Sequence, residues 1–186
     1  RWFLKLGLLK FNQMRATEGA QRVASAKEAI QYLEQSVALD ARPEARFNLL
    51  GSLAQAAYEA GDSEKARCFA NEVLDDAAKY RDHWNYGNAI YEGHLVLGML
   101  ALSSGDTEAA KSHLLASGKS PGSPQLNTFG PSMVLARELL EAGEKEVVVE
   151  YLGLCGHFWK MDEGQLARWC SQIREGRTPD FGDQGR

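Results

Sequence analysis

The chain has 186 residues, 44% of them hydrophobic and 25% charged, an ordinary composition for a globular domain with a buried core. Its net charge is -4, from 21 basic and 25 acidic residues scattered along the sequence, without the basic stripe that is typical of nucleic-acid binding. The longest apolar runs, such as residues 95–102, are far shorter than the roughly 20 residues of a membrane span. We therefore expect neither a nucleic-acid partner nor a membrane span in this chain.

The three cysteines, Cys68, Cys155 and Cys170, are odd in number and lack CxxC spacing. This pattern predicts free thiols rather than a disulfide framework or a structural zinc site, and we expect no cofactor. The sequence does not determine the cellular compartment of the protein, although the cytoplasm is slightly favoured. The chain begins with Arg1 rather than Met, which is compatible with a trimmed or processed chain whose targeting signal lay upstream.

Helical periodicity dominates the sequence, and β-strand patterns are nearly absent. Ser25 and Glu28 have the spacing of a capping box, in which each side chain accepts from an amide at the start of a helix. This spacing predicts that the second helix begins at Ser25. The nine predicted helices are residues 1–16, 25–39, 44–60, 63–80, 89–103, 107–117, 131–142, 144–159 and 163–175.

Three of the predicted turns share one pattern. Gly61, Gly105 and Gly143 each follow an apolar helical run and each precede an acidic residue, as expected where one helix ends and the next begins. A leucine stands seven or eight residues before each glycine. The residue five positions after each glycine is Ala66, Ala110 or Val148. A small residue at that position lets the second helix approach the first.

This spacing resembles the tetratricopeptide repeat (TPR), a helix–turn–helix unit with Leu-Gly, then Gly-Asp or Gly-Asn, then a small residue. The resemblance covers about residues 1–155 in four degenerate units. No unit has the family's Trp, and the spacings of 44 and 38 residues between the turn glycines exceed the family's roughly 34. The resemblance implies an all-α fold over residues 1–175, a right-handed α-solenoid of about four TPR-like helical hairpins plus a C-terminal capping helix.

Two further segments bear on the repeat interpretation. The stretches NYGNAI at residues 85–90 and SPQLNTFGP at residues 123–131 resemble an uncharacterised bacterial TPR-like family, which implies no particular activity. The last segment, residues 176–186, is rich in Gly, Pro and Asp, and we expect a flexible C-terminal tail. Residues 179–181 of that tail could fold back onto the concave groove that the TPR resemblance implies.

The TPR resemblance implies a concave groove lined by the first helix of each unit. Amide, aromatic, methionine and charged side chains on that face suit an extended peptide or a partner helix. We therefore predict a protein- or peptide-binding scaffold rather than an enzyme, with a partner that the sequence does not identify. The candidate partner-binding residues are Asn48, Gln55, Tyr58, Tyr91, Glu92, Met99, Met133, Arg137 and Glu141.

Residues 80–94 are the densest polar-aromatic cluster, with four aromatic side chains, two histidines and two carboxylates. No known metal-ligand spacing occurs there, so we expect neither a metal nor a catalytic site. The alternative hypothesis is a small-molecule or metal-binding accessory domain, and a third is a regulatory or targeting module of a larger chain. The accessory domain would use Asp82, His83, Tyr91, Glu92 and His94.

Residues 118–131 read as the one long loop, stiffened by three prolines. The loop lacks the glycine spacing and the preceding strand of a phosphate-binding loop. Two interpretations stay open: it packs Leu126 and Phe129 between units, or it contributes to ligand recognition.

Overall fold

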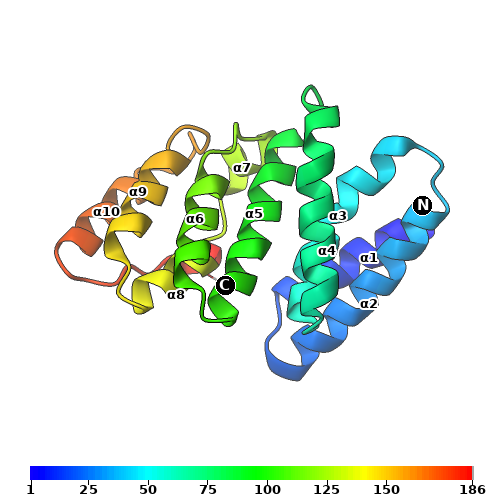
Figure 1. Ribbon diagram of the computed structural model, residues 1–186, viewed down its shortest axis with the longest axis horizontal. Helices are drawn as coiled ribbons and strands as arrows, with labels where there is room; N and C mark the ends of the chain where they lie inside the picture. Colours follow the sequence, from blue (N-terminus) through cyan, green and yellow to red (C-terminus); the bar gives the residue numbers. More distant parts are fainter. Residues whose placement is uncertain (186) are drawn as a thin grey trace. The chain divides into compact units, whose positions relative to one another are not determined.

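The computed structural model describes residues 1–185, and over these residues it is all helical, without a β-strand, which confirms the predicted all-α class (Figure 1). None of the described helices is long and apolar enough to cross a membrane. The chain divides into two compact units, Arg1–Arg81 and Asp82–Arg186. The α-helices are α1 (Trp2–Arg15), α2 (Gly19–Ala38), α3 (Pro43–Glu59), α4 (Ser63–Ala77), α5 (Tyr86–Ser103), α6 (Thr107–Gly118), α7 (Pro124–Phe129), α8 (Val134–Glu141), α9 (Lys145–Cys155) and α10 (Gln165–Arg174), and the short 3-10 helices are η1 (Ala78–Tyr80) and η2 (Gly182–Gly185).

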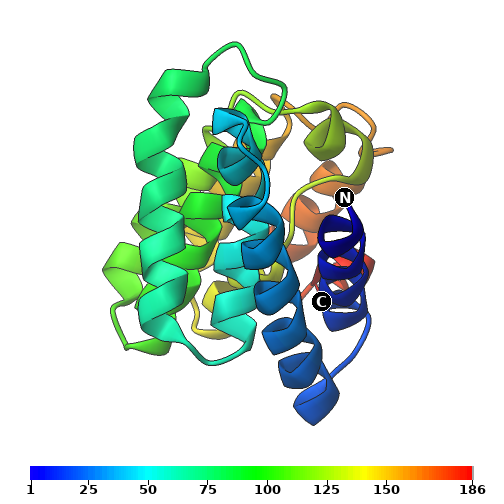
Figure 2. The same ribbon diagram turned by 90° about the vertical axis from the view of Figure 1, so that its right-hand side faces the viewer.

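The first unit consists of two helical hairpins, α1 with α2 and α3 with α4, and α2 also packs on α3. Figure 2 shows α1 and α2, both in blue, running side by side. Apolar side chains close the hairpins, and Leu33, Phe47 and Leu50 are fully buried. Since burial of such a side chain contributes about 1.5–3 kcal/mol, this interior is the main source of the unit's stability.

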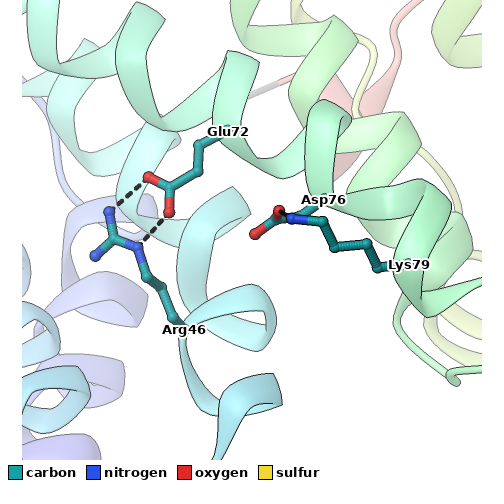
Figure 3. A network of polar contacts seen from close by, with 4 residues as sticks. All are labelled: Arg46, Glu72, Asp76 and Lys79. Carbon is teal, nitrogen blue, oxygen red and sulfur yellow. Dashed lines mark hydrogen bonds and ion pairs between the residues drawn. The ribbon is translucent and has the colours of Figure 1, made fainter.

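A polar pair joins α3 to α4 at the edge of that interior. The guanidinium of Arg46 faces the carboxylate of Glu72 in a two-pronged arrangement, with Nη2 donating to Oε2 at 2.5 Å (Figure 3). Arg46 also lies over the Phe69 ring, 5.8 Å from its centroid. Figure 3 shows the pair of Asp76 and Lys79 beside it, which lies within one helical stretch and is more exposed. Partly exposed pairs of this kind contribute about 1 kcal/mol or less, so they orient the helices more than they stabilise them.

The second unit contains the hairpins α5 with α6 and α8 with α9, and α10 packs on α9. Helix α6 also contacts α9, so the two hairpins share one apolar interior. Leu114, Leu135 and Leu139 are fully buried in it.

The three repeated turns have the same geometry, as their sequence pattern predicts. Gly61, Gly105 and Gly143 have φ of +80°, +84° and +93°, in the region that favours glycine. In each turn the amide after the glycine donates to a carbonyl five residues earlier, at 2.9 Å. This is the hydrogen bond of a Schellman helix end. The side chains of Asp62 and Asp106 then accept from an amide of the next helix, each at 3.0 Å.

The small residues after these turns lie where the repeat pattern places them. Ala66, Ala110 and Val148 are completely buried. Hence each second helix approaches its partner closely at that position.

Two local predictions were wrong. Helix α2 begins at Gly19, six residues before the predicted capping box, so Ser25 is a buried residue inside the helix whose Oγ lies 3.4 Å from Gln21 Nε2. The turn before α2 is instead closed by Thr17, whose hydroxyl donates to the Gln13 carbonyl at 2.8 Å. The predicted loop at 118–131 contains α7, because Ser123 caps the Leu126 amide at 3.0 Å and proline occupies the first helical position.

Candidate functional site

Three of the nine predicted partner-binding residues belong to the first unit. Asn48, Gln55 and Tyr58 lie on α3, and all three are half-buried. The Asn48 Oδ1 atom is buried and has no hydrogen-bond partner among the described residues. Helix α3 therefore carries one polar atom whose desolvation is uncompensated within the described chain.

The next three residues, Tyr91, Glu92 and Met99, lie on α5 in the second unit. Tyr91 and Met99 are only 3% and 5% exposed, whereas Glu92 is half-buried. In this structure Tyr91 and Met99 stabilise the interior and do not form part of an open surface.

The last three residues lie at α8. Met133 immediately precedes the helix and is completely buried, while Arg137 and Glu141 lie on its more exposed side. The Arg137 Nε and Glu141 Oε1 atoms are 3.9 Å apart. Of the nine residues, Met133 and Arg137 are hydrogen-bonded to the C-terminal segment of the chain.

That segment consists of residues 179–185, which we call the tail segment. The backbone N–H of Met133 donates to the Gln184 carbonyl at 2.5 Å, and the Arg137 guanidinium donates to the Gly185 carbonyl. The Gln184 side-chain amide donates in turn to the Phe129 carbonyl at 3.2 Å. Two of these three bonds hold main-chain carbonyls of the tail segment, so they do not depend on its side chains.

An aromatic side chain anchors the other end of the tail segment. Phe181 is 3% exposed, and its ring meets the Trp169 ring edge-on at a centroid distance of 5.1 Å. Trp169 of α10 lies 5.9 Å from the ring of Trp159. Gly130 lies so close to Trp159 that a Cβ atom there would be 2.5 Å from the indole Cε2. The close contact of Gly130 with Trp159 therefore holds in place the ring that lies next to Trp169.

We call the receiving residues Phe129, Met133, Arg137 and Trp169 the tail-binding surface. They come from α7, the start of α8, α8 itself and α10. For residues 176–186 the sequence predicts a flexible tail, and the structure places Phe181 in contact with Trp169 and Gln184 in contact with Met133.

Two buried tyrosines fix the backbone at the centre of this surface. The hydroxyls of Tyr91 and Tyr151 both donate to the Ser132 carbonyl, at 2.9 and 3.3 Å, and lie 3.3 Å from each other. Burial raises the pKa of both tyrosines well above the ordinary value, so both remain neutral donors. Since the Ser132 carbonyl precedes the Met133 amide, Tyr91 positions the donor that the tail segment uses.

Cys155 lies beside Tyr151 in the same interior. Burial raises the pKa of its thiol to about 12, which keeps it protonated and unreactive at neutral pH. Cys155, the last residue of α9, is thus a packing residue that is completely buried.

The two unusual sequence segments pack against each other and support the surface from the α5 side. Ser120 Oγ donates to the Gly87 carbonyl at 2.7 Å, and Ser123 Oγ donates to Asn88 Oδ1 at 2.5 Å. The backbones come so close that a Cβ at Gly87 would lie 1.7 Å from the Gly122 oxygen. Residues 80–94 therefore position the 118–131 segment.

The residues of the alternative hypothesis do not converge. Asp82 is exposed, the Nδ1 of His83 accepts from the Asn85 amide at 3.2 Å, and Tyr91 points to Ser132. His94 instead meets His113 of α6, with 3.1 Å between their Nδ1 atoms. Among the described residues, His, Cys, Asp and Glu form no group of three that could hold a metal ion.

The first unit also has an open surface cavity of about 460 Å³ between α2 and the start of α4. An ion pair of Lys65 with Glu34, 2.9 Å long, crosses its lining. Lysine and carboxylate side chains are mixed around it, so the lining favours neither sign of charge.

The sequence did not assign Trp169 to the binding surface, although it did indicate that residues 179–181 could fold back onto the groove. A signal for Trp169 existed, because it lies on the apolar stripe of the last helix together with Leu166 and Ile173. The main-chain donor at Met133 had no such signal, because every non-proline residue carries one. No family model matches the chain, and neither a curated protein nor a solved structure matches it.

Proposed function

We propose that the chain is a binding scaffold for a protein or peptide partner, not an enzyme, and that the tail-binding surface is where a short partner segment lies. Its repeat architecture is proposed to be a right-handed TPR-like solenoid. The single observation that carries the proposal is the pair of tail carbonyls held by the Met133 amide and the Arg137 guanidinium. Recognition through main-chain carbonyls is how many scaffolds bind extended peptides of varied sequence.

The geometry supports peptide recognition in two further ways. The Met133 donor is fixed before any partner arrives, because the Ser132 carbonyl of the same peptide group is held by Tyr91 and Tyr151. The aromatic anchor site at Trp169 gives the surface a preferred side chain, since buried aromatic residues carry much of the free energy of association in interfaces.

The experiment is selection of a random peptide library on the full chain, followed by affinity measurements on variants. Arg137→Ala should weaken the selected peptides by about tenfold or more, because a charge-assisted hydrogen bond is worth about 1.5–3 kcal/mol. Arg174→Ala is the matched control, an exposed arginine near the end of α10 in the same unit. Selected peptides that bind both variants like the wild type would disprove the proposed surface.

The alternative, a small-molecule or metal-binding accessory domain, keeps one supporting observation, the contact between His94 and His113. Calorimetric titration with Zn²⁺ tests it. Stoichiometric binding that is lost in His94→Ala would favour this alternative over the scaffold.

A further inference from the structure

We propose that the tail segment is a displaceable ligand that the chain carries for its own binding surface. The same surface also binds a separate short peptide that has the pattern of the tail segment. In this pattern an aromatic residue is followed by glycine, and the carbonyls of the third and fourth residues after the aromatic residue accept hydrogen bonds from the surface. This inference rests on the proposed function and specifies its ligand.

The pattern is set by the contacts of the tail segment itself. Phe181 supplies the ring, and Gly182 follows with φ of +58°, a conformation suited to glycine. Asp180 holds that turn by accepting from the Gly182 amide at 2.8 Å. The carbonyls of Gln184 and Gly185, three and four residues after the phenylalanine, are the two that the surface binds.

The connection to the tail segment permits displacement. Residues 175–178, which join α10 to it, are all exposed, and Gly176 has φ of +78°. The tail segment is attached by two buried side chains, Pro179 and Phe181, and by a few hydrogen bonds around Met133, Arg137 and Phe129. These gains are opposed by the entropy of ordering seven residues, which makes a segment of this kind the first part of a domain to open.

A tethered segment competes strongly with free peptides. Because it is attached to the chain, its effective concentration at the surface is in the millimolar range for a short linker. A free peptide must displace the tail segment. The apparent Kd of the peptide for the wild type is therefore its intrinsic Kd divided by the fraction of molecules whose surface is open.

The test uses the full-length chain and a fluorescently labelled synthetic peptide of residues 178–185, TPDFGDQG. Phe181→Ala should bind this peptide about tenfold or more tightly than the wild type does, because the mutant tail has lost its anchor and no longer competes. Met161→Ala is the matched control, an apolar residue of the same unit that is 57% exposed and lies outside the tail-binding surface. It should bind like the wild type.

Two variants establish that the peptide takes the place of the tail. Adding Arg137→Ala to Phe181→Ala should weaken binding, as should replacing the peptide's own phenylalanine by alanine. If Phe181→Ala binds the peptide no better than the wild type does, or if neither change weakens it, the proposal is overturned. Library peptides that depend on Arg137 would still support the proposed function, so the two failures are distinguishable.

A second measurement keeps the proposal testable should Phe181→Ala fold poorly. The unlabelled peptide contains neither lysine nor arginine, and Arg177 lies two residues before the start of the tail segment. Saturating peptide should therefore speed tryptic cleavage of the wild type after Arg177, because the released tail becomes accessible. An unchanged cleavage rate contradicts displacement.

Sedimentation analysis shows whether the bound tail belongs to the same copy of the chain. If the wild type is a dimer and Phe181→Ala is a monomer, the tail binds a second copy, and its assignment as an intramolecular ligand is overturned.

Discussion

Replacing Gly87 with alanine should separate the two unusual segments of the second unit. The added Cβ would lie 1.7 Å from the Gly122 oxygen and 2.4 Å from its carbonyl carbon, both of which are backbone atoms. Ordinary van der Waals contacts begin at about 3.4 Å, so one of the two backbones must move by more than an ångström. A rotamer change cannot relieve this contact, because no flexible side chain is involved.

The magnitude follows from the contacts that such a movement breaks. Ser120 loses its hydrogen bond to the Gly87 carbonyl, and Ser123 loses its bond to Asn88. Each loss costs about 1 kcal/mol, and overpacking adds about 1–3 kcal/mol. The free energy of unfolding should therefore fall by about 3–5 kcal/mol, which lowers Tm by about 6–20 °C for a chain of this length.

Gly153→Ala is the matched control, because it is the same substitution in α9 of the same unit. A Cβ at Gly153 meets nothing within 4 Å, so the change should be neutral or stabilise by about 0.5–1 kcal/mol through helix propensity. Urea unfolding followed by circular dichroism measures both variants. If Gly87→Ala unfolds at the same urea concentration as the wild type, the close approach of residues 80–94 to residues 118–131 is wrong.

Three further predictions concern the rest of the chain. Ala66→Leu and Ala110→Leu should each destabilise by about 1–3 kcal/mol in the same assay, because both alanines are completely buried where two helices meet; wild-type stability in both would refute the repeat register. In the native protein an aromatic disulfide reagent should modify the exposed Cys68 quickly and the buried Cys155 only after unfolding, whereas rapid labelling of both would contradict the packing of α9. Burial and then the nearby imidazole of His113 lower the pKa of His94 below its ordinary 6.5, so the unfolded chain binds more protons than the folded chain and stability is lost as the pH falls below about 6.5. His94→Gln should reduce this loss of stability at low pH. An unchanged dependence of stability on pH would refute the prediction.

The repeated turns could be predicted from the sequence because their causes are local. Gly61, Gly105 and Gly143 are needed for positive φ, and the residues around each turn satisfy the helix ends without any distant partner. The start of α2 could not be predicted in the same way. Ser25 has the correct local chemistry for a helix start, but the turn was closed earlier by Thr17, and the packing of α2 on α1 buried Ser25 instead.

The candidate site was less predictable because its key atoms are not distinguished by residue type. The sequence identifies Arg137 as a candidate partner-binding residue, and its guanidinium does donate to the Gly185 carbonyl of the tail segment. Tyr91 has equally suitable chemistry for an exposed surface, yet its hydroxyl is directed inward to the Ser132 carbonyl. Which face of α5 is buried depends on the distant residue Tyr151, a contact that helical periodicity alone does not encode.

Of the two residues that the structural interpretation of residues 118–131 would pack, Leu126 is buried, whereas Phe129 is 72% exposed. Helix α7 ends at Phe129, whose carbonyl accepts from the tail segment, and the backbone then passes Gly130 and Ser132 to reach the Met133 amide. The packing that orders this segment is therefore the same packing that aims its main-chain groups at a ligand. It follows that Gly87→Ala, although distant from the ligand, should weaken binding of the tail peptide as well as stability. Ala66→Leu disturbs a helix pair of the first unit, which contributes no group to the surface, and it should change stability alone.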